Sequence, residues 1–189
     1  MQQLATPDEL LAQMARQIQT LLSDKAIDNP LMVGIQTGGV WVATKLYQQL
    51  QQQLNTSEAA TSKPVFSDPL ATLDISFYRD DFSRIGMNPK VKPSQLPPDV
   101  ENRHIILVDD VLHTGRTIRA AMNELFDYGR PASITLVCLI DRSGRELPLQ
   151  ADIIGEHIIL NDGEHIKITG PEPLAFELQQ AATKNTANG

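Results

Sequence analysis

Apolar positions along the chain switch between helical spacing and short uninterrupted runs. Residues 6–24 carry apolar side chains on one helical face, after the capping box Thr6-Pro7-Asp8-Glu9 with proline at the first helical position. Residues 31–35, LMVGI, are continuously apolar, as is typical of a strand covered on both faces. A second helical pattern follows, with these positions inward: Val40, Ala43, Leu46, Tyr47, Leu50 and Leu54.

The stretch HIILVDDVLHTGRT, residues 104–117, repeats this order of strand, loop and helix. Its apolar run ends at Asp109 and Asp110, and a helical pattern begins at Thr117. Gly129 and the following Pro131 end that helix. Its inward positions are Ile118, Ala121, Met122, Leu125 and Phe126. Ligands of open α/β sheets bind beyond the carboxyl ends of strands, so this loop is the expected site.

The remaining segments complete one α/β domain. Leu73, Ile75 and Phe77 alternate with Asp74, Ser76 and Tyr78, which predicts a strand with one solvent-facing side. Further strands are expected at 132–140 and 153–160, and a terminal hairpin at 165–168 and 174–178. Residues 51–69 are polar and predict a surface connection, and prolines and a glycine interrupt every pattern in 79–102.

Composition indicates an ordinary globular protein. Of 189 residues, 41% are apolar and 21% charged. No apolar run approaches the roughly 20 residues of a membrane span, and no secretory signal is visible. The one cysteine, Cys138, lies in an apolar run and is expected in the core. We therefore expect a cytoplasmic protein with no membrane partner. The histidines lack ligand spacing, so no protein metal site is expected.

The chemistry of residues 109–117 suits a ribose phosphate. A helix N-terminus offers unpaired N–H groups to an anion, Gly115 permits close approach, and Thr114 and Thr117 add hydroxyl donors. The two carboxylates accept hydrogen bonds, as ribose hydroxyls require. An acidic strand end also occurs in receiver domains and P-loop NTPases. A receiver has its acidic pair near the domain start, and no G-x-x-x-x-G-K-S/T stretch exists here.

Three segments carry a family resemblance: DISFYRDD (74–81), VDDVLHTGRTIRAAMNELFDYGRP (108–131) and DRSGRELP (141–148). They resemble the type I phosphoribosyltransferases, and within these the pyrimidine operon regulator/uracil phosphoribosyltransferase (PyrR) family, over roughly residues 31–178. That family usually has Tyr in place of His113, and Thr-Arg-Gly where this chain has Thr37-Gly38-Gly39.

The resemblance implies a mostly parallel, twisted sheet flanked by helices, with a small C-terminal β hood. Residues 1–179 would form a single phosphoribosyltransferase domain, in which 79–102 is a flexible active-site loop and 141–179 the hood and terminal hairpin. Residues 180–189 are expected to be a disordered tail.

The same resemblance implies roles for individual residues. Catalysis would involve Asp109, Asp110 and Arg79. The phosphoribosyl pyrophosphate (PRPP) phosphate would be bound by Val111, Leu112, His113, Thr114, Gly115, Arg116 and Thr117. The pyrophosphate loop would be Gln36, Thr37, Gly38 and Gly39, and the base would contact Ile140, Asp141 and Arg142. Two assignments stay open. His113 would contact phosphate, face RNA or fill the space of the tyrosine, and Arg145 would bind the base segment or pair with Glu146 or Asp152.

The implied activity is the formation of UMP and pyrophosphate from uracil and PRPP, with Mg²⁺ carried by PRPP. A homodimer or higher oligomer is expected. The alternatives are an RNA-binding pyrimidine regulator that senses UMP with little catalysis, and transfer to another base such as hypoxanthine or orotate. The net charge of −7 argues against RNA binding, unless an oligomer gathers Arg16, Arg142 and Arg145 into one patch.

Overall fold

The computed structural model describes residues 4–56, 64–75, 94–97, 100–161 and 163–180. The helices are α1 (Pro7–Asp24), α2 (Gly38–Thr56) and α3 (Arg116–Asp127). The strands are β1 (Leu31–Ile35), β2 (Ala71–Leu73), β3 (His104–Leu112), β4 (Ser133–Arg142), β5 (Ile153–Ile158), β6 (Glu164–Thr169) and β7 (Ala175–Gln180).

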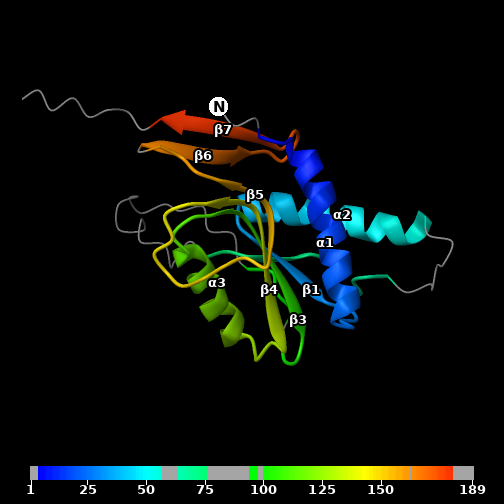
Figure 1. Cartoon of the computed structure of the whole chain (residues 1–189). Coiled ribbons are helices and arrows are strands. Elements are labelled where there is room, and N and C mark those ends of the chain that lie inside the picture. Colours follow the sequence, from blue (N-terminus) through cyan, green and yellow to red (C-terminus); the bar gives the residue numbers. More distant parts are fainter. Residues whose placement is uncertain (1–3, 57–63, 76–93, 98–99, 162, 181–189) are drawn as a thin grey trace, which may run out of the picture.

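Five strands form a parallel sheet in the order β2-β1-β3-β4-β5. The three central strands carry apolar runs at their buried positions because helices cover both faces of the sheet. Helices α1 and α2 lie on one face and α3 on the other (Figure 1). Alternate positions of β3 feed the two cores, with Ile106 facing α1 and α2 and Leu107 facing α3. The expected fold class is confirmed.

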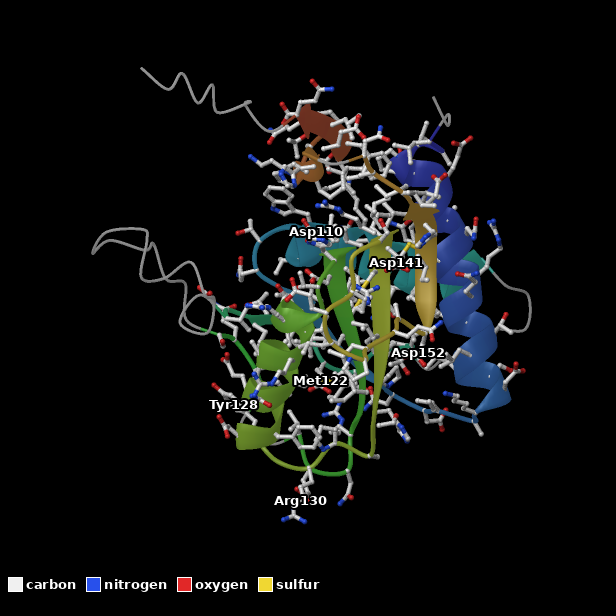
Figure 2. The ribbon with its side chains drawn as sticks, turned by 60° about the vertical axis from the view of Figure 1, so that its left-hand side comes forward. Asp110, Met122, Tyr128, Arg130, Asp141 and Asp152 are labelled. Atoms are coloured by element: carbon white, nitrogen blue, oxygen red, sulfur yellow. The ribbon has the colours of Figure 1, made fainter. Side chains whose placement is uncertain are left out.

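The second sheet is the expected hood, the antiparallel pair of β6 and β7. Figure 2 shows Asp110 and Asp141 at the end of the large sheet that faces the hood, and Arg130 at the opposite end. The turn between β6 and β7 is fixed to α2, because Gly170 packs on Trp41 and Lys45 forms an ion pair with Glu172. The hood therefore covers the end of the sheet where the carboxyl ends of the strands meet.

Several local expectations were wrong. Helix α2 continues to Thr56, so residues 51–56 are helical rather than a surface connection, and Phe66 is buried against Tyr47 with ring centroids 4.8 Å apart. Asp74 was expected to face solvent, but the residue is only 8% exposed. Phe126 was expected inward but is 56% exposed, and the buried residues of α3 are Ile118, Ala120, Ala121 and Leu125.

The strand ends also differ from expectation. Strands β3 and β4 continue through Asp110 and Asp141, because the parallel ladder pairs Asp109 with Cys138 and Leu112 with Asp141. Within 79–102, the described Gln95 exchanges backbone hydrogen bonds with Thr72 of β2. Gln180, which was expected in the tail 180–189, is the last residue of β7. The following lie outside the described side chains: Leu54, Phe77, Tyr78, Arg79 and the rest of the tail, 181–189. None of the described helices is long and apolar enough to cross a membrane.

Candidate active site

The start of α2 lies directly against the acidic end of β3. A Cβ atom on Gly38 would fall 1.9 Å from Oδ2 of Asp110 and 2.9 Å from its Cβ. A Cβ on Gly39 would fall 2.6 Å from the carbonyl oxygen of Val108 and 3.0 Å from Cα of Asp109. Both glycines are therefore required by close approach, and the pyrophosphate loop of the sequence prediction contacts the acidic pair. The peptide bond between Gln36 and Thr37 is cis.

The two carboxylates differ in their surroundings. Asp109 is 5% exposed, and its Oδ1 accepts a hydrogen bond from the Asp110 N–H at 3.0 Å. Oδ1 of Asp110 accepts from the Val111 N–H at 2.9 Å, while Oδ2 faces Gly38. Hydrogen bonds from the following peptide fix both side chains at the strand end. Carboxylate oxygens accept hydrogen bonds, as ribose hydroxyls require, and they are also the hard ligands that suit the Mg²⁺ of a phosphorylated substrate.

The phosphate loop, residues 113–117, turns from β3 into α3. Gly115 has φ +90°, a conformation that side-chain-bearing residues rarely adopt, and it is the N-cap of α3. The hydroxyl oxygen of Thr114 accepts from the Arg116 N–H at 3.2 Å. Within the described part of the chain, no protein acceptor meets the N–H groups of Thr114, Gly115 or Thr117. This loop offers free N–H donors at the positive end of a helix, which favours an anion.

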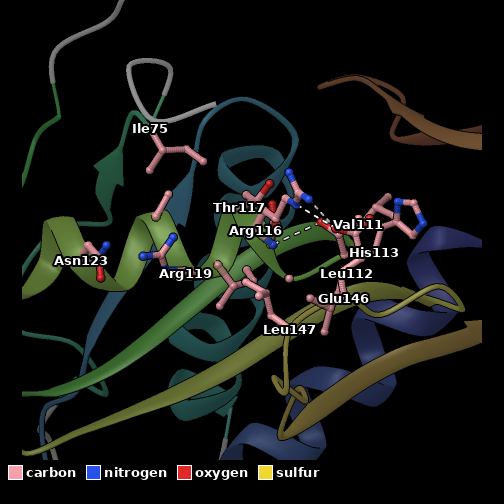
Figure 3. Close-up of a pocket in the computed structure, with 15 residues that line it drawn as sticks. Ile75, Val111, Leu112, His113, Arg116, Thr117, Arg119, Asn123, Glu146 and Leu147 are labelled. Carbon is pink, nitrogen blue, oxygen red and sulfur yellow. Dashed lines mark hydrogen bonds and ion pairs between the residues drawn. The ribbon is translucent and has the colours of Figure 1, made fainter. Parts of the chain in front are cut away.

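A cavity of about 830 Å³ opens over this loop. Figure 3 shows His113 and Val111 at one end of it and Ile75 and Asn123 at the other. Asp109 also lines it. The lining residues that the sequence prediction missed are Ile75, Ile118, Arg119, Ala120, Asn123, Glu146 and Leu147. Helical spacing from Arg116 could have found Arg119, Ala120 and Asn123, because i+3, i+4 and i+7 share one face. No local sequence pattern indicated that the remaining residues line the cavity.

The predicted base segment lies beside the phosphate loop, because Val111 pairs with Ile140 and Leu112 with Asp141 in adjacent strands. Both carboxylate oxygens of Asp141 have protein partners. Oδ1 accepts from Arg145, and Oδ2 lies 3.0 Å from Nδ1 of His157 on β5. Arg145 therefore pairs with neither of the surface carboxylates that were expected as alternatives.

Arg142 reaches toward the hood. Its Nη1 lies 3.3 Å from Nδ1 of His165 on β6, and its buried Nε has no hydrogen-bond partner among the described atoms. A donor group with an unused N–H at this position could bind a ligand held between the sheet and the hood.

His113 packs its ring on the backbone of Gly144, where a Cβ would lie 2.8 Å from Nε2. Partial burial lowers the pKa of His113 below its usual value, and the nearby Arg142 guanidinium lowers it further. The neutral imidazole therefore predominates at pH 7. The ring lines one end of the cavity as it packs on the β4–β5 connection.

The structure brings together most of the predicted site residues. The acidic pair, the phosphate loop, the two glycines and the base segment all lie at the hood-facing end of the sheet. Arg79, the predicted cation for the leaving group, lies outside the described residues.

Comparison with protein families matches residues 3–176 to the phosphoribosyl transferase domain. Among curated relatives, the bifunctional protein PyrR of Nitrosococcus oceani is 53% identical over 172 residues, which are 91% of this chain and 90% of the relative. The bifunctional protein PyrR of Pseudomonas syringae pv. tomato is 51% identical over 180 residues, 95% of this chain and 98% of the relative.

Solved structures support the fold. A hypoxanthine phosphoribosyltransferase of Trypanosoma cruzi superposes with a TM-score of 0.58 at 23% identity, covering 85% of this chain and 83% of that one. A hypoxanthine phosphoribosyltransferase from Staphylococcus aureus gives 0.57 at 18%, covering 84% and 78%. The domain match and the relatives at about half identity agree with the motifs at the strand ends. The chain belongs to the type I phosphoribosyltransferases and, among these, to the PyrR family.

Proposed function

We propose that this protein transfers the ribose 5-phosphate of PRPP to N1 of uracil, forming UMP and pyrophosphate, and that it also regulates pyrimidine genes in response to UMP. The proposal rests on three features that lie together in the fold. An anion-binding loop, a carboxylate pair and a glycine turn meet at one end of a parallel sheet, under a hood. Family membership supports the same reading.

Each part of the site then has one task. The N–H groups of Thr114, Gly115 and Thr117 and the two threonine hydroxyls hold the 5′-phosphate. Asp109 and Asp110 accept hydrogen bonds from the ribose hydroxyls. The turn at Gly38 and Gly39 brings backbone donors near the acidic pair, where the pyrophosphate would lie.

The reaction breaks the bond between C1′ and the pyrophosphate oxygen and forms the bond from C1′ to N1 of uracil, whose N1 proton passes to solvent. Positive charge develops at the sugar ring in such a transfer, and carboxylates beside the ring stabilise it. Mg²⁺ bound to PRPP would neutralise part of the pyrophosphate charge. Asp110 is suited to contact that cation because its Oδ2 faces the glycine turn. Arg79 stays the proposed cation for the leaving group.

The base would lie between β4 and the hood. The proposed contacts are Ile140, Asp141 and Arg142, and they differ in which hydrogen-bonding groups are free. Both Asp141 oxygens are already bound, so its backbone groups are the better candidates. Arg142 has a buried Nε–H that could bind a uracil carbonyl oxygen. A homodimer and a cytoplasmic location remain part of the proposal.

RNA binding is the second proposed role, and the PyrR relatives, named bifunctional, favour it. The patch of Arg16, Arg142 and Arg145 is a poor candidate for it. The Arg145 side chain is 24% exposed and is bound to Asp141, so its charge is neutralised locally. The net charge of −7 also requires that any RNA surface be local.

The first prediction concerns the acidic pair. Asp110→Asn keeps the shape of the side chain and removes its charge. Formation of UMP from PRPP and uracil should fall at least about tenfold, because the carboxylate stabilises charge developing in the transition state. Steady-state assays of the purified protein measure this. Asp127→Asn, at an exposed position of α3, is the control. Unchanged turnover of the Asp110 variant would contradict the catalytic role of Asp110.

A second prediction follows from the contact between Gly38 and Asp110. Gly38→Ala places a methyl group where Oδ2 lies, and even rotation of the carboxylate leaves the 2.9 Å contact with Cβ. Overpacking of this kind costs about 1–3 kcal/mol, so UMP should bind roughly five- to 150-fold more weakly in calorimetric titrations.

An Asp110→Ala background supplies the control for this second prediction. If Gly38→Ala acts by displacing the Asp110 carboxylate, it should weaken UMP binding much less in that background. Equal losses in both backgrounds would show that position 38 acts independently of Asp110.

The third prediction tests the regulator role. In gel-shift titrations against the leader of a pyrimidine transcript, we expect a complex whose midpoint changes by about five- to 150-fold when UMP is added. The absence of a shift at moderate salt, with UMP present, would reject this role and leave the enzymatic one unaffected.

A further inference from the structure

The connection from β4 to β5 passes beside the phosphate loop. The two strands are parallel neighbours, so the chain must return along one face of the sheet between Arg142 and Ile153. It returns on the α3 side without a helix, and Leu149 and Ala151 pack in the α3 core. We call residues 143–149 of this connection the strap. Topology alone brings the strap to the phosphate loop.

The strap holds the outer side of the loop through its backbone. The N–H groups of Glu146 and Leu147 both donate to the carbonyl oxygen of Thr114, each at 3.0 Å. Arg145 donates through Nη1 to the carbonyl oxygen of His113. Two consecutive carbonyl groups of the loop are thus bound to the strap.

Side chains add to this attachment. Oε2 of Glu146 accepts a hydrogen bond from Nε of Arg116 at 2.8 Å and lies 2.7 Å from Nη2 of the same guanidinium. A Cβ on Gly115 would lie 3.4 Å from Cβ of Leu147 and 3.6 Å from Cδ of Arg145, so the glycine backbone is in contact with the strap.

The direction of these carbonyl groups fixes the direction of the next N–H groups. In a trans peptide, the C=O and the following N–H lie in one plane and point in opposite directions. The His113 carbonyl points to the strap, so the Thr114 N–H points away from it. The same holds for the Thr114 carbonyl and the Gly115 N–H. Neither N–H meets a protein acceptor in the described part of the chain. The strap thereby leaves two adjacent donors for an anion.

Arg145 is the rigid member of the strap. Its Nη2 donates to Asp141, and the side chains are 24% and 15% exposed. The other oxygen of Asp141 is held by His157 of the neighbouring strand. A guanidinium with two fixed acceptors in its fork has little freedom, and hydrogen bonds to charged groups are the stronger ones. Arg145 therefore connects the end of β4 to the backbone of the phosphate loop.

We infer that Arg145 is a positioning residue for phosphate binding. Through the His113 carbonyl it turns the Thr114 N–H toward the 5′-phosphate of PRPP without touching the phosphate, beside the Gly115 N–H that the strap backbone orients. The inference rests on the proposed function, because it concerns the same site. The inference distinguishes substrate binding from the chemical step. Arg145 does not contact Asp109 or Asp110, near which the reacting atoms would lie. Replacement of Arg145 should therefore lower PRPP affinity and leave the chemical step unchanged.

The test is a comparison of Arg145→Met with Arg103→Met in steady-state kinetics. Arg103 is a matched control, because its side chain is 25% exposed and forms a 2.7 Å ion pair with Asp68 away from the site. For Arg145→Met, KM for PRPP should rise at least about fivefold with kcat within about twofold, as the loss of a charge-assisted hydrogen bond implies. Arg103→Met should lower Tm without changing KM.

Arg145→Lys keeps the charge but cannot bind both acceptors in a fork, so it should recover part of the PRPP affinity. If the Met variant does not fold, the Lys variant decides, with an expected rise in KM of about threefold. A purely structural role would lower Tm and the active fraction, and so the apparent kcat, at unchanged KM. That result, or wild-type KM in the Lys variant, would overturn the inference. Wild-type protein without UMP formation would instead refute the proposed function, and the inference with it.

Discussion

The close contact between the start of α2 and the end of β3 is the constraint on which the site depends. Two glycines without side chains let the backbone of one strand–helix unit approach the carboxylates of the next. Gly38 stands where the family usually has arginine, and the Asp110 carboxylate occupies the space that a side chain would need. The departure from the family pattern is therefore matched by the placement of Asp110. In this protein the Asp110 carboxylate and the glycine turn pack closely together. Under the proposed function, a cation for the pyrophosphate would therefore come from another residue.

The parallel sheet supplies the second condition. Because the carboxyl ends of β1, β3 and β4 meet at one end, three loops far apart in the chain reach the same space. The return of the chain from β4 to β5 then adds a support behind the phosphate loop. The proposed phosphate and base sites thus lie on neighbouring segments, which the ion pair of Asp141 and Arg145 connects.

Apolar periodicity predicted the main elements well, since a covered strand such as β1 and a capped helix such as α1 follow from local rules. The turn at residues 113–117 between β3 and α3 was predictable because its residues lie in one continuous segment, and its phosphate binding stays a prediction. Contacts between distant segments were not. The burial of Asp74, the engagement of Asp141 by Arg145 and the role of Glu146 depend on which segments meet in the fold. The exposure of Phe126 shows the same limit, because helical spacing alone does not tell how wide a core face is.

The central claim is transfer of ribose 5-phosphate to uracil at the carboxyl end of the sheet. It is tested most directly by pyrophosphate release from PRPP and Mg²⁺ with a panel of uracil, hypoxanthine, orotate and no base. The account predicts release with uracil, with UMP as the product. Rates with the other bases should be at least about tenfold lower, because a different base leaves hydrogen-bonding groups of the base site unpaired. Faster release with hypoxanthine or orotate, or no release with uracil, would contradict it.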